Sequence, residues 1–154
     1  KELNPNQIEF LKEKGFVQVR LCGLEAYSQW FVVKKPETNE SIEHYFIIQA
    51  ITDELKKYTQ NVTAYPTFGP DIVFQVKRGE EASGWYAIEV ETGKRAKNHA
   101  DLEAKTDKNN RNDKPKYTQW WFVVTDKYYK PEYEKLHQTI TRTEVKEKIA
   151  SLFR

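Results

Sequence analysis

Residues 69–94, GPDIVFQVKRGEEASGWYAIEVETGK, predict a β-hairpin. The runs 71–76 and 85–91 are rich in β-branched and aromatic residues, and the polar, glycine-containing segment between them is typical of a turn. In an antiparallel pair, the start of one strand lies beside the end of the other. We therefore expect Asp71, which follows Gly-Pro and opens the first strand, to face the end of the second.

The second strand of this hairpin carries two carboxylates on one side. Side chains two apart on a strand point to the same face, so Glu89 and Glu91 share a face. The opposite face is apolar and can pack on a helix; it consists of Tyr86, Ile88 and Val90. Burying an unpaired ionised carboxylate costs several kcal/mol, so a cation or a proton must compensate. With Asp71 nearby, the pattern predicts a hard-metal site, because Mg²⁺ prefers oxygen ligands. Such a metal stabilises negative charge and helps to generate hydroxide in phosphodiester hydrolysis, and a nearby lysine would stabilise the transition state.

The motif GPDIVFQV, a short turn and then YAIEVETGK resembles the PD-(D/E)xK nuclease superfamily, which includes restriction endonucleases and archaeal Holliday-junction resolvases. The resemblance implies an α/β fold with a restriction-endonuclease-like core, in which helices flank a central mixed sheet in the order α-β-β-β-α-β, over residues 40–125. It makes Asp71 the PD acid and Glu89 the acid of the (D/E)xK motif. Glu43 would be the acid that some members supply from the first helix, although Glu54 projects from that helix in nearly the same direction.

The sequence departs from this motif at its lysine position, which holds Glu91. Some branches of the superfamily write the motif as ExE and supply the lysine from elsewhere. Lys94 and Lys105 are the two substitutes. Lys105 is slightly preferred, because it lies on the next predicted helix, whereas Lys94 follows a Thr-Gly turn. The resemblance thus implies the catalytic set Asp71, Glu89, Glu91 and Lys105 or Lys94, with Mg²⁺ or Mn²⁺ held by Asp71, Glu89, Glu91 and Glu43.

The rest of the chain supplies the elements of one core with an extension. We predict helices over 5–14, 40–58, about 98–108 and 141–153. We predict further strands over 16–21, 27–33, 61–66 and 118–127. Residues 1–39 are expected to form an extension packed on the core, and residues 40–154 the nuclease-like domain with its C-terminal helix. His44 is expected at the edge of the core, and Trp30, Trp85, Trp120 and Trp121 are expected inside it.

Composition indicates a globular chain, with 154 residues, 31% of them charged and 38% hydrophobic. No apolar run approaches the roughly 20 residues that cross a bilayer, and no signal peptide is visible, so we expect no membrane partner and a cytoplasmic location. The single cysteine, Cys22, excludes an internal disulfide and a cysteine metal cluster. Because the chain begins with Lys1 and lacks methionine, we expect a processed product or a piece of a larger chain or complex.

The net charge of +2 does not by itself indicate a nucleic-acid partner, so the distribution of charge matters. Residues 94–116 carry eight Lys or Arg against four Asp or Glu. This segment is compatible with contacts along a phosphate backbone and equally with a solvated loop. The candidate DNA-binding residues are Lys94, Arg95, Lys97, Lys105, Lys108 and Arg111.

Two functions follow from these expectations. The first is a metal-dependent DNA endonuclease that acts in replication, recombination, transfer or defence. The alternative is a catalytically inactive nuclease-like domain that binds DNA or supports assembly within a larger DNA-processing protein. Family members often dimerise, so a homodimer is compatible with either function, although the sequence reveals no dimer surface. A structural interpretation stays open as well, in which Glu89 and Glu91 protect an exposed strand edge and Asp71 is a turn residue.

Overall fold

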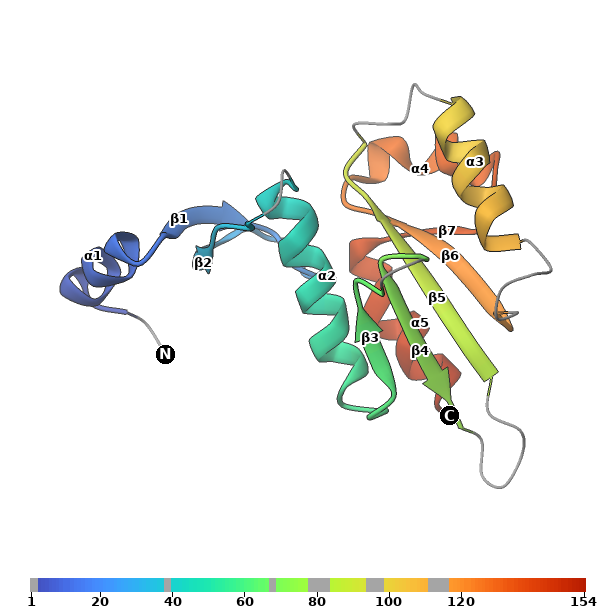
Figure 1. Ribbon diagram of the computed structural model, residues 1–154, viewed down its shortest axis with the longest axis horizontal. Coiled ribbons are helices and arrows are strands. Elements are labelled where there is room, and N and C mark those ends of the chain that lie inside the picture. The colour runs from blue at the N-terminus through green and yellow to red at the C-terminus, as the bar shows by residue number, and fades with distance from the viewer. Residues whose placement is uncertain (1–2, 38–39, 67–68, 78–83, 94–98, 111–116) are drawn as a thin grey trace.

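The computed structural model describes the chain except for residues 1–2, 38–39, 67–68, 78–83, 94–98 and 111–116 (Figure 1). The strands are β1 (Phe16–Leu21), β2 (Gln29–Lys34), β3 (Val62–Ala64), β4 (Ile72–Val76), β5 (Gly84–Glu91), β6 (Gln119–Val124) and β7 (Thr139–Thr141). The helices are α1 (Pro5–Glu13), α2 (Ile42–Leu55), α3 (His99–Asn110), α4 (Lys130–Glu134) and α5 (Val145–Leu152), with short 3-10 turns at Lys127–Tyr129 and Arg142–Glu144.

A five-stranded mixed sheet in the order β3-β4-β5-β6-β7 forms the centre of the molecule. Strands β3, β4 and β5 are antiparallel neighbours, whereas β5, β6 and β7 run parallel. The predicted α/β class with a central mixed sheet flanked by helices is confirmed, and the element order from α2 to β6 is α-β-β-β-α-β as expected. The short strand β7 and helix α4 were not predicted, because three and five residues are too few for a periodic pattern.

Two hydrophobic cores cover the two faces of this sheet. Helices α2 and α5 pack on one face, where Ile88 and Val90 of β5 are buried. Helices α3 and α4 cover the other face, where Ala87 of β5 packs with Leu102 and Tyr133. The alternation in β5 therefore divides its side chains between the cores as predicted, and it directs Glu89 and Glu91 to the side of α3 and α4.

The helix termini carry the caps that the sequence provides. The Ser41 side chain accepts a hydrogen bond from the His44 backbone N–H and caps α2. Thr141 and Glu144 form the predicted capping box ahead of α5. In α2, the predicted apolar face is buried at Ile47, Ile48, Ile51 and Leu55. These caps begin the two helices that cover one face of the sheet.

The N-terminal residues form an arm that projects from the body of the molecule (Figure 1). It consists of α1 and the two-stranded sheet β1–β2, and the ring of Phe31 lies 4.6 Å from that of Phe46 on α2. The prediction that all four tryptophans are core residues was wrong for two of them. Trp30 is 66% exposed and Trp85 41% exposed, because the first lies on the arm and the second at the start of β5.

Within the described part of the chain, no helix combines the length and the apolar character that a membrane crossing requires.

Candidate functional site

Asp71 joins three elements at the edge where β4 begins and β5 ends. Ile72 pairs with Ile88, so the antiparallel register brings the residue before β4 to the end of β5, as expected. Asp71 Oδ2 accepts a hydrogen bond of 2.7 Å from the Val90 backbone N–H and lies 3.3 Å from Nε2 of His44 on α2. Burial opposes ionisation, but His44, Lys105 and the Val90 N–H outweigh it and lower the pKa of Asp71.

His44 lies between acceptors on both sides of its ring. Nδ1 contacts the carboxylate of Glu40, and Nε2 lies 3.0 Å from the Val90 carbonyl oxygen as well as near Asp71. Carboxylates and carbonyls only accept, so both ring nitrogens must donate, and His44 is an imidazolium cation. Burial lowers the pKa of His44, but the hydrogen bonds and charges of Asp71 and Glu40 outweigh it and raise the pKa to about 9.

Tyr65 completes this first group of contacts. Its hydroxyl donates to Glu40 Oε1 at 2.7 Å, and its backbone N–H donates to the Asp71 carbonyl at 2.8 Å. Burial and the Glu40 carboxylate raise the pKa of the Tyr65 hydroxyl. Tyr65 has a φ of 53°, a conformation that is rare outside glycine and costs about 1–3 kcal/mol. The surrounding contacts therefore hold a strained residue beside Asp71.

Lys105 of α3 contacts both Glu89 and Glu91 on the face of the sheet that α3 and α4 cover. Its Nζ lies 3.2 Å from Glu89 Oε2 and 2.7 Å from Glu91 Oε1. Glu89 and Glu91 are only 3% and 4% exposed, so this ammonium group is the compensating charge that their burial requires. Burial lowers the pKa of Lys105, but the two glutamates outweigh it and raise that pKa.

The remaining oxygens of the two glutamates also accept hydrogen bonds. Asn109 donates to Glu89 Oε1 at 3.0 Å, and the Tyr133 hydroxyl donates to Glu91 Oε2 at 3.2 Å. Lys105 and Asn109 are four residues apart on α3 and therefore reach the same strand from one helix face. Burial, with a contribution from the charge of Asp71, raises the pKa of Glu89 despite the opposing effects of Lys105 and Asn109.

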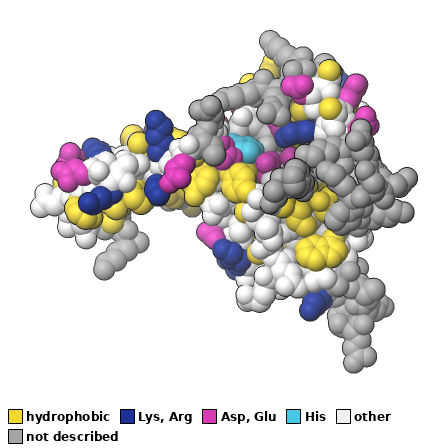
Figure 2. Space-filling model, in the orientation of Figure 1, with side chains coloured by type: hydrophobic (Ala, Val, Ile, Leu, Met, Phe, Trp, Pro, Cys, Tyr) yellow, Lys and Arg dark blue, Asp and Glu magenta, His cyan; other side chains and the backbone are white. Residues whose placement is uncertain are grey.

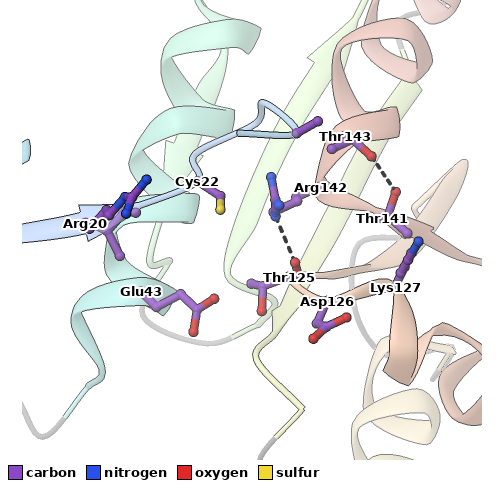
Figure 3. A pocket seen from close by; sticks show the side chains of 11 residues that line it. Arg20, Cys22, Glu43, Thr125, Asp126, Lys127, Thr141, Arg142 and Thr143 are labelled. Carbon is purple, nitrogen blue, oxygen red and sulfur yellow. Dashed lines mark hydrogen bonds between the residues drawn. The ribbon is translucent and has the colours of Figure 1, made fainter. Parts of the chain in front are cut away.

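The structure thus brings together three of the acids and one of the lysines named from the sequence: Asp71, Glu89, Glu91 and Lys105. Glu43 is exposed on α2 and lines a pocket of about 700 Å³ with Arg20 and Lys127 (Figure 3). The predictions for Lys94, Arg95, Lys97 and Arg111 fall outside the described residues, as does the side chain of Lys108.

Sequence reasoning missed several members of the site. The sequence predicts His44 only as a core-edge residue and gives no site prediction for Glu40, Tyr65, Asn109 or Tyr133. Two of the missed contacts had a local signal, because Glu40 precedes His44 by four residues and Asn109 follows Lys105 by four. Tyr65 and Tyr133 had no such signal. Tyr65 follows the three-residue strand β3 and donates to Glu40, 25 residues away, and Tyr133 lies on the five-residue helix α4 and donates to Glu91, 42 residues away. On the face of the molecule shown in Figure 2, histidine, acidic and cationic side chains lie together near the centre.

Asp71 and Glu89 are the pair whose chemistry fits a divalent cation. Both offer hard oxygen donors, and the charge of Asp71 contributes to the raised pKa of Glu89, a repulsion that a bound cation would relieve. Lys105 and Asn109 each donate one hydrogen bond to a different oxygen of Glu89, and a carboxylate oxygen has two lone pairs, so each can still form a ligand bond. In the part of the chain that the structure describes, no three His, Cys, Asp or Glu side chains are arranged to hold a metal between them.

No protein-family model matches the chain, and neither a curated protein nor a solved structure matches it.

Proposed function

We propose that this protein is a metal-dependent DNA endonuclease with a PD-(D/E)xK-type site. The observation that carries the proposal is the convergence of Asp71, Glu89 and Lys105 at one edge of the sheet, on the element order of that superfamily. A buried site that combines carboxylates with a lysine is suited to a phosphodiester, whose hydrolysis places additional negative charge on phosphate oxygens.

Asp71 and Glu89 would hold Mg²⁺ or Mn²⁺. When bound, the ion supplies positive charge that stabilises the phosphate during hydrolysis. Lys105 takes the part of the lysine that the ExE motif lacks, since its Nζ lies within hydrogen-bond distance of both glutamates. His44 fixes the orientation of Asp71 and partly neutralises its charge before a metal binds. Asn109 orients Glu89 in the same manner.

Cleavage of supercoiled plasmid and of labelled oligonucleotides in Mg²⁺ or Mn²⁺ tests this proposal. We expect Asp71→Asn and Glu89→Gln each to lower the rate at least about 10²-fold, the scale on which enzymes depend on electrostatic stabilisation. Glu54→Gln is the matched control, because Glu54 is a buried glutamate paired with Lys57 on the far part of α2. Equal cleavage by the wild type, Asp71→Asn and Glu89→Gln would refute the assignment.

A second candidate function is DNA binding without cleavage. Lys105, Asn109 and Tyr133 together donate to all four oxygens of Glu89 and Glu91, as expected of a site in which a lysine has replaced the metal. Calorimetric titration with Mn²⁺ separates the two functions. Binding that disappears in Asp71→Asn favours the endonuclease, whereas intact DNA binding with no metal affinity favours the second candidate.

A further inference from the structure

One face of the β1–β2 hairpin is open to solvent and carries an aromatic ring among polar and cationic groups. In the antiparallel register Arg20 pairs with Trp30, and Gln18 pairs with Val32. Trp30 is 66% exposed, and Gln18, Arg20 and Lys34 are exposed as well. Neither strand contains an acidic residue. The face thus presents positive charge and a large ring to solvent, which is complementary to a polyanion with flat bases.

The opposite face of the hairpin accounts for its attachment to the body. Phe31 points to that side and packs against Phe46 of α2. Because side chains alternate along a strand, Trp30 must point away from this contact. The exposure of Trp30 therefore follows from the hairpin's register, and packing against α2 does not require a tryptophan at this position.

Arg20 of the hairpin face also lines a pocket that lies next to the end of β5. Arg20 lines the pocket of about 700 Å³ together with Thr125, Lys127 and Arg142, and Figure 3 shows Arg20 and Lys127 on opposite sides of it. The Thr125 backbone N–H donates to the Glu91 carbonyl at 3.0 Å, which places this pocket next to the end of β5. Three cationic residues, Arg20, Lys127 and Arg142, line it against two carboxylates, Glu43 and Asp126.

We propose that the face formed by Gln18, Arg20, Trp30 and Lys34 binds single-stranded DNA beside the bond to be cut. The inference rests on the proposed function, because it assigns how the substrate reaches that site. Trp30 stacks on an unpaired base, and Arg20 contacts a phosphate of the same strand. Stacking on a side chain needs a base released from pairing, so the ring favours a single strand over a duplex.

Fluorescence anisotropy of a labelled single-stranded oligonucleotide in EDTA tests the inference, since no metal-dependent cleavage takes place. We expect Trp30→Ala to raise the Kd roughly 5- to 100-fold, the range expected for loss of one stacked base. Arg20→Gln should weaken binding and reduce the slope of log K against log salt by about one. Trp85→Ala and Lys56→Gln are matched controls, because both residues are exposed away from the arm, and we expect them to change the Kd less than twofold.

Three results would overturn the inference. The first is equal affinity of Trp30→Ala and Trp85→Ala for the single strand. The second is an equal loss of duplex affinity in Trp30→Ala. The third is a change of sedimentation state in Trp30→Ala with unchanged DNA affinity, which would identify the face as a protein interface.

The test is separable from that of the proposed function. Binding to the hairpin face is measured in EDTA, whereas the proposed function is measured as cleavage in Mg²⁺ or Mn²⁺, so either assay can fail while the other succeeds. If the wild type cleaves nothing while binding still depends on Trp30, the proposed function fails and the assignment of this face as a single-strand binding surface stands. If the wild type cleaves while Trp30→Ala binds normally, this inference fails and the proposed function stands.

Discussion

His44 Nε2 lies 3.3 Å from a carboxylate oxygen of Asp71, across 27 residues of sequence, and this contact joins α2 to the hairpin β4–β5. The ring nitrogens of His44 contact the Glu40 carboxylate, the Asp71 carboxylate and the Val90 carbonyl, all of which accept hydrogen bonds. Both nitrogens therefore carry protons, and the imidazole is positively charged. The stability of the fold is therefore linked to the proton on His44.

Stability in EDTA should fall as the pH rises from about 6.5 to about 9. The folded pKa of His44 is raised to about 9 from 6.5, so its contribution is complete below pH 6.5 and is lost as the pH passes through the folded pKa. The expected loss is of the order of 2–3 kcal/mol in the free energy of unfolding, measured with denaturant. His44→Gln should flatten this slope, whereas His137→Gln should keep it. A wild type with equal stability at the two ends of this range would contradict the prediction.

Lys105→Met should destabilise the fold by about 3 kcal/mol at neutral pH, because it leaves two buried carboxylates without a cation. A protonated carboxyl has no charge, so the deficit relative to wild type should narrow as the pH falls. Lys57→Met is the control: its Nζ lies 2.6 Å from Glu54, but the lysine side chain is 63% exposed, and we expect less than about 1 kcal/mol. Similar losses in the two variants would show that Lys105 does not compensate the buried charges.

Tyr133→Phe should cost about 1–2 kcal/mol of unfolding free energy, because it removes the hydroxyl that donates to Glu91 in a fully buried position. Tyr128→Phe provides the comparison, since Tyr128 is 79% exposed and should tolerate the change. Thermal and denaturant unfolding of both variants measure the difference. A neutral Tyr133→Phe would mean that Glu91 does not depend on this hydroxyl.

Gly93→Ala should be more destabilising than Gly15→Ala. The two glycines have almost the same backbone, with φ values of 83° and 82°. A Cβ at Gly93 would lie 2.2 Å from the ring of Tyr129, whereas a Cβ at Gly15 would meet nothing within 4 Å. Gly15→Ala therefore reports the backbone cost alone, and the additional loss at Gly93 reports the clash. In a Tyr129→Ala background, Gly93→Ala should cost no more unfolding free energy than Gly15→Ala does in the wild type.

Glu43→Gln should leave DNA cleavage within about fivefold of wild type, in contrast to the much larger loss expected for Glu89→Gln. Glu43 lines the pocket beside the hairpin and lies outside the hydrogen-bonded group around Asp71 and Lys105. Cleavage rates in Mn²⁺ under identical conditions give the comparison. A loss as large as that of Glu89→Gln would support the predicted role of Glu43 as a metal ligand.

Local patterns in the sequence were sufficient for most of the fold. The alternation from Tyr86 to Glu91 predicted which side chains share the apolar face and which share the face with the carboxylates, because side chains alternate along a strand. The helical periodicity of α2 and the capping box at Thr141 could also be predicted from the sequence. Each of these features depends on residues within a few positions of one another.

Only the tertiary structure decided which groups meet the carboxylates. Lys105 contacts Glu91 from a helix 14 residues further on, and His44 contacts Asp71 from the opposite layer of the sheet. The two tryptophans Trp30 and Trp121 have the same side chain, yet Trp30 on the arm is 66% exposed and Trp121 in the central sheet is fully buried. Such partners depend on the way whole elements pack. The alternation along β5 places two carboxylates on a buried face, where their charge must be compensated. The packing of distant elements determines which residue compensates it.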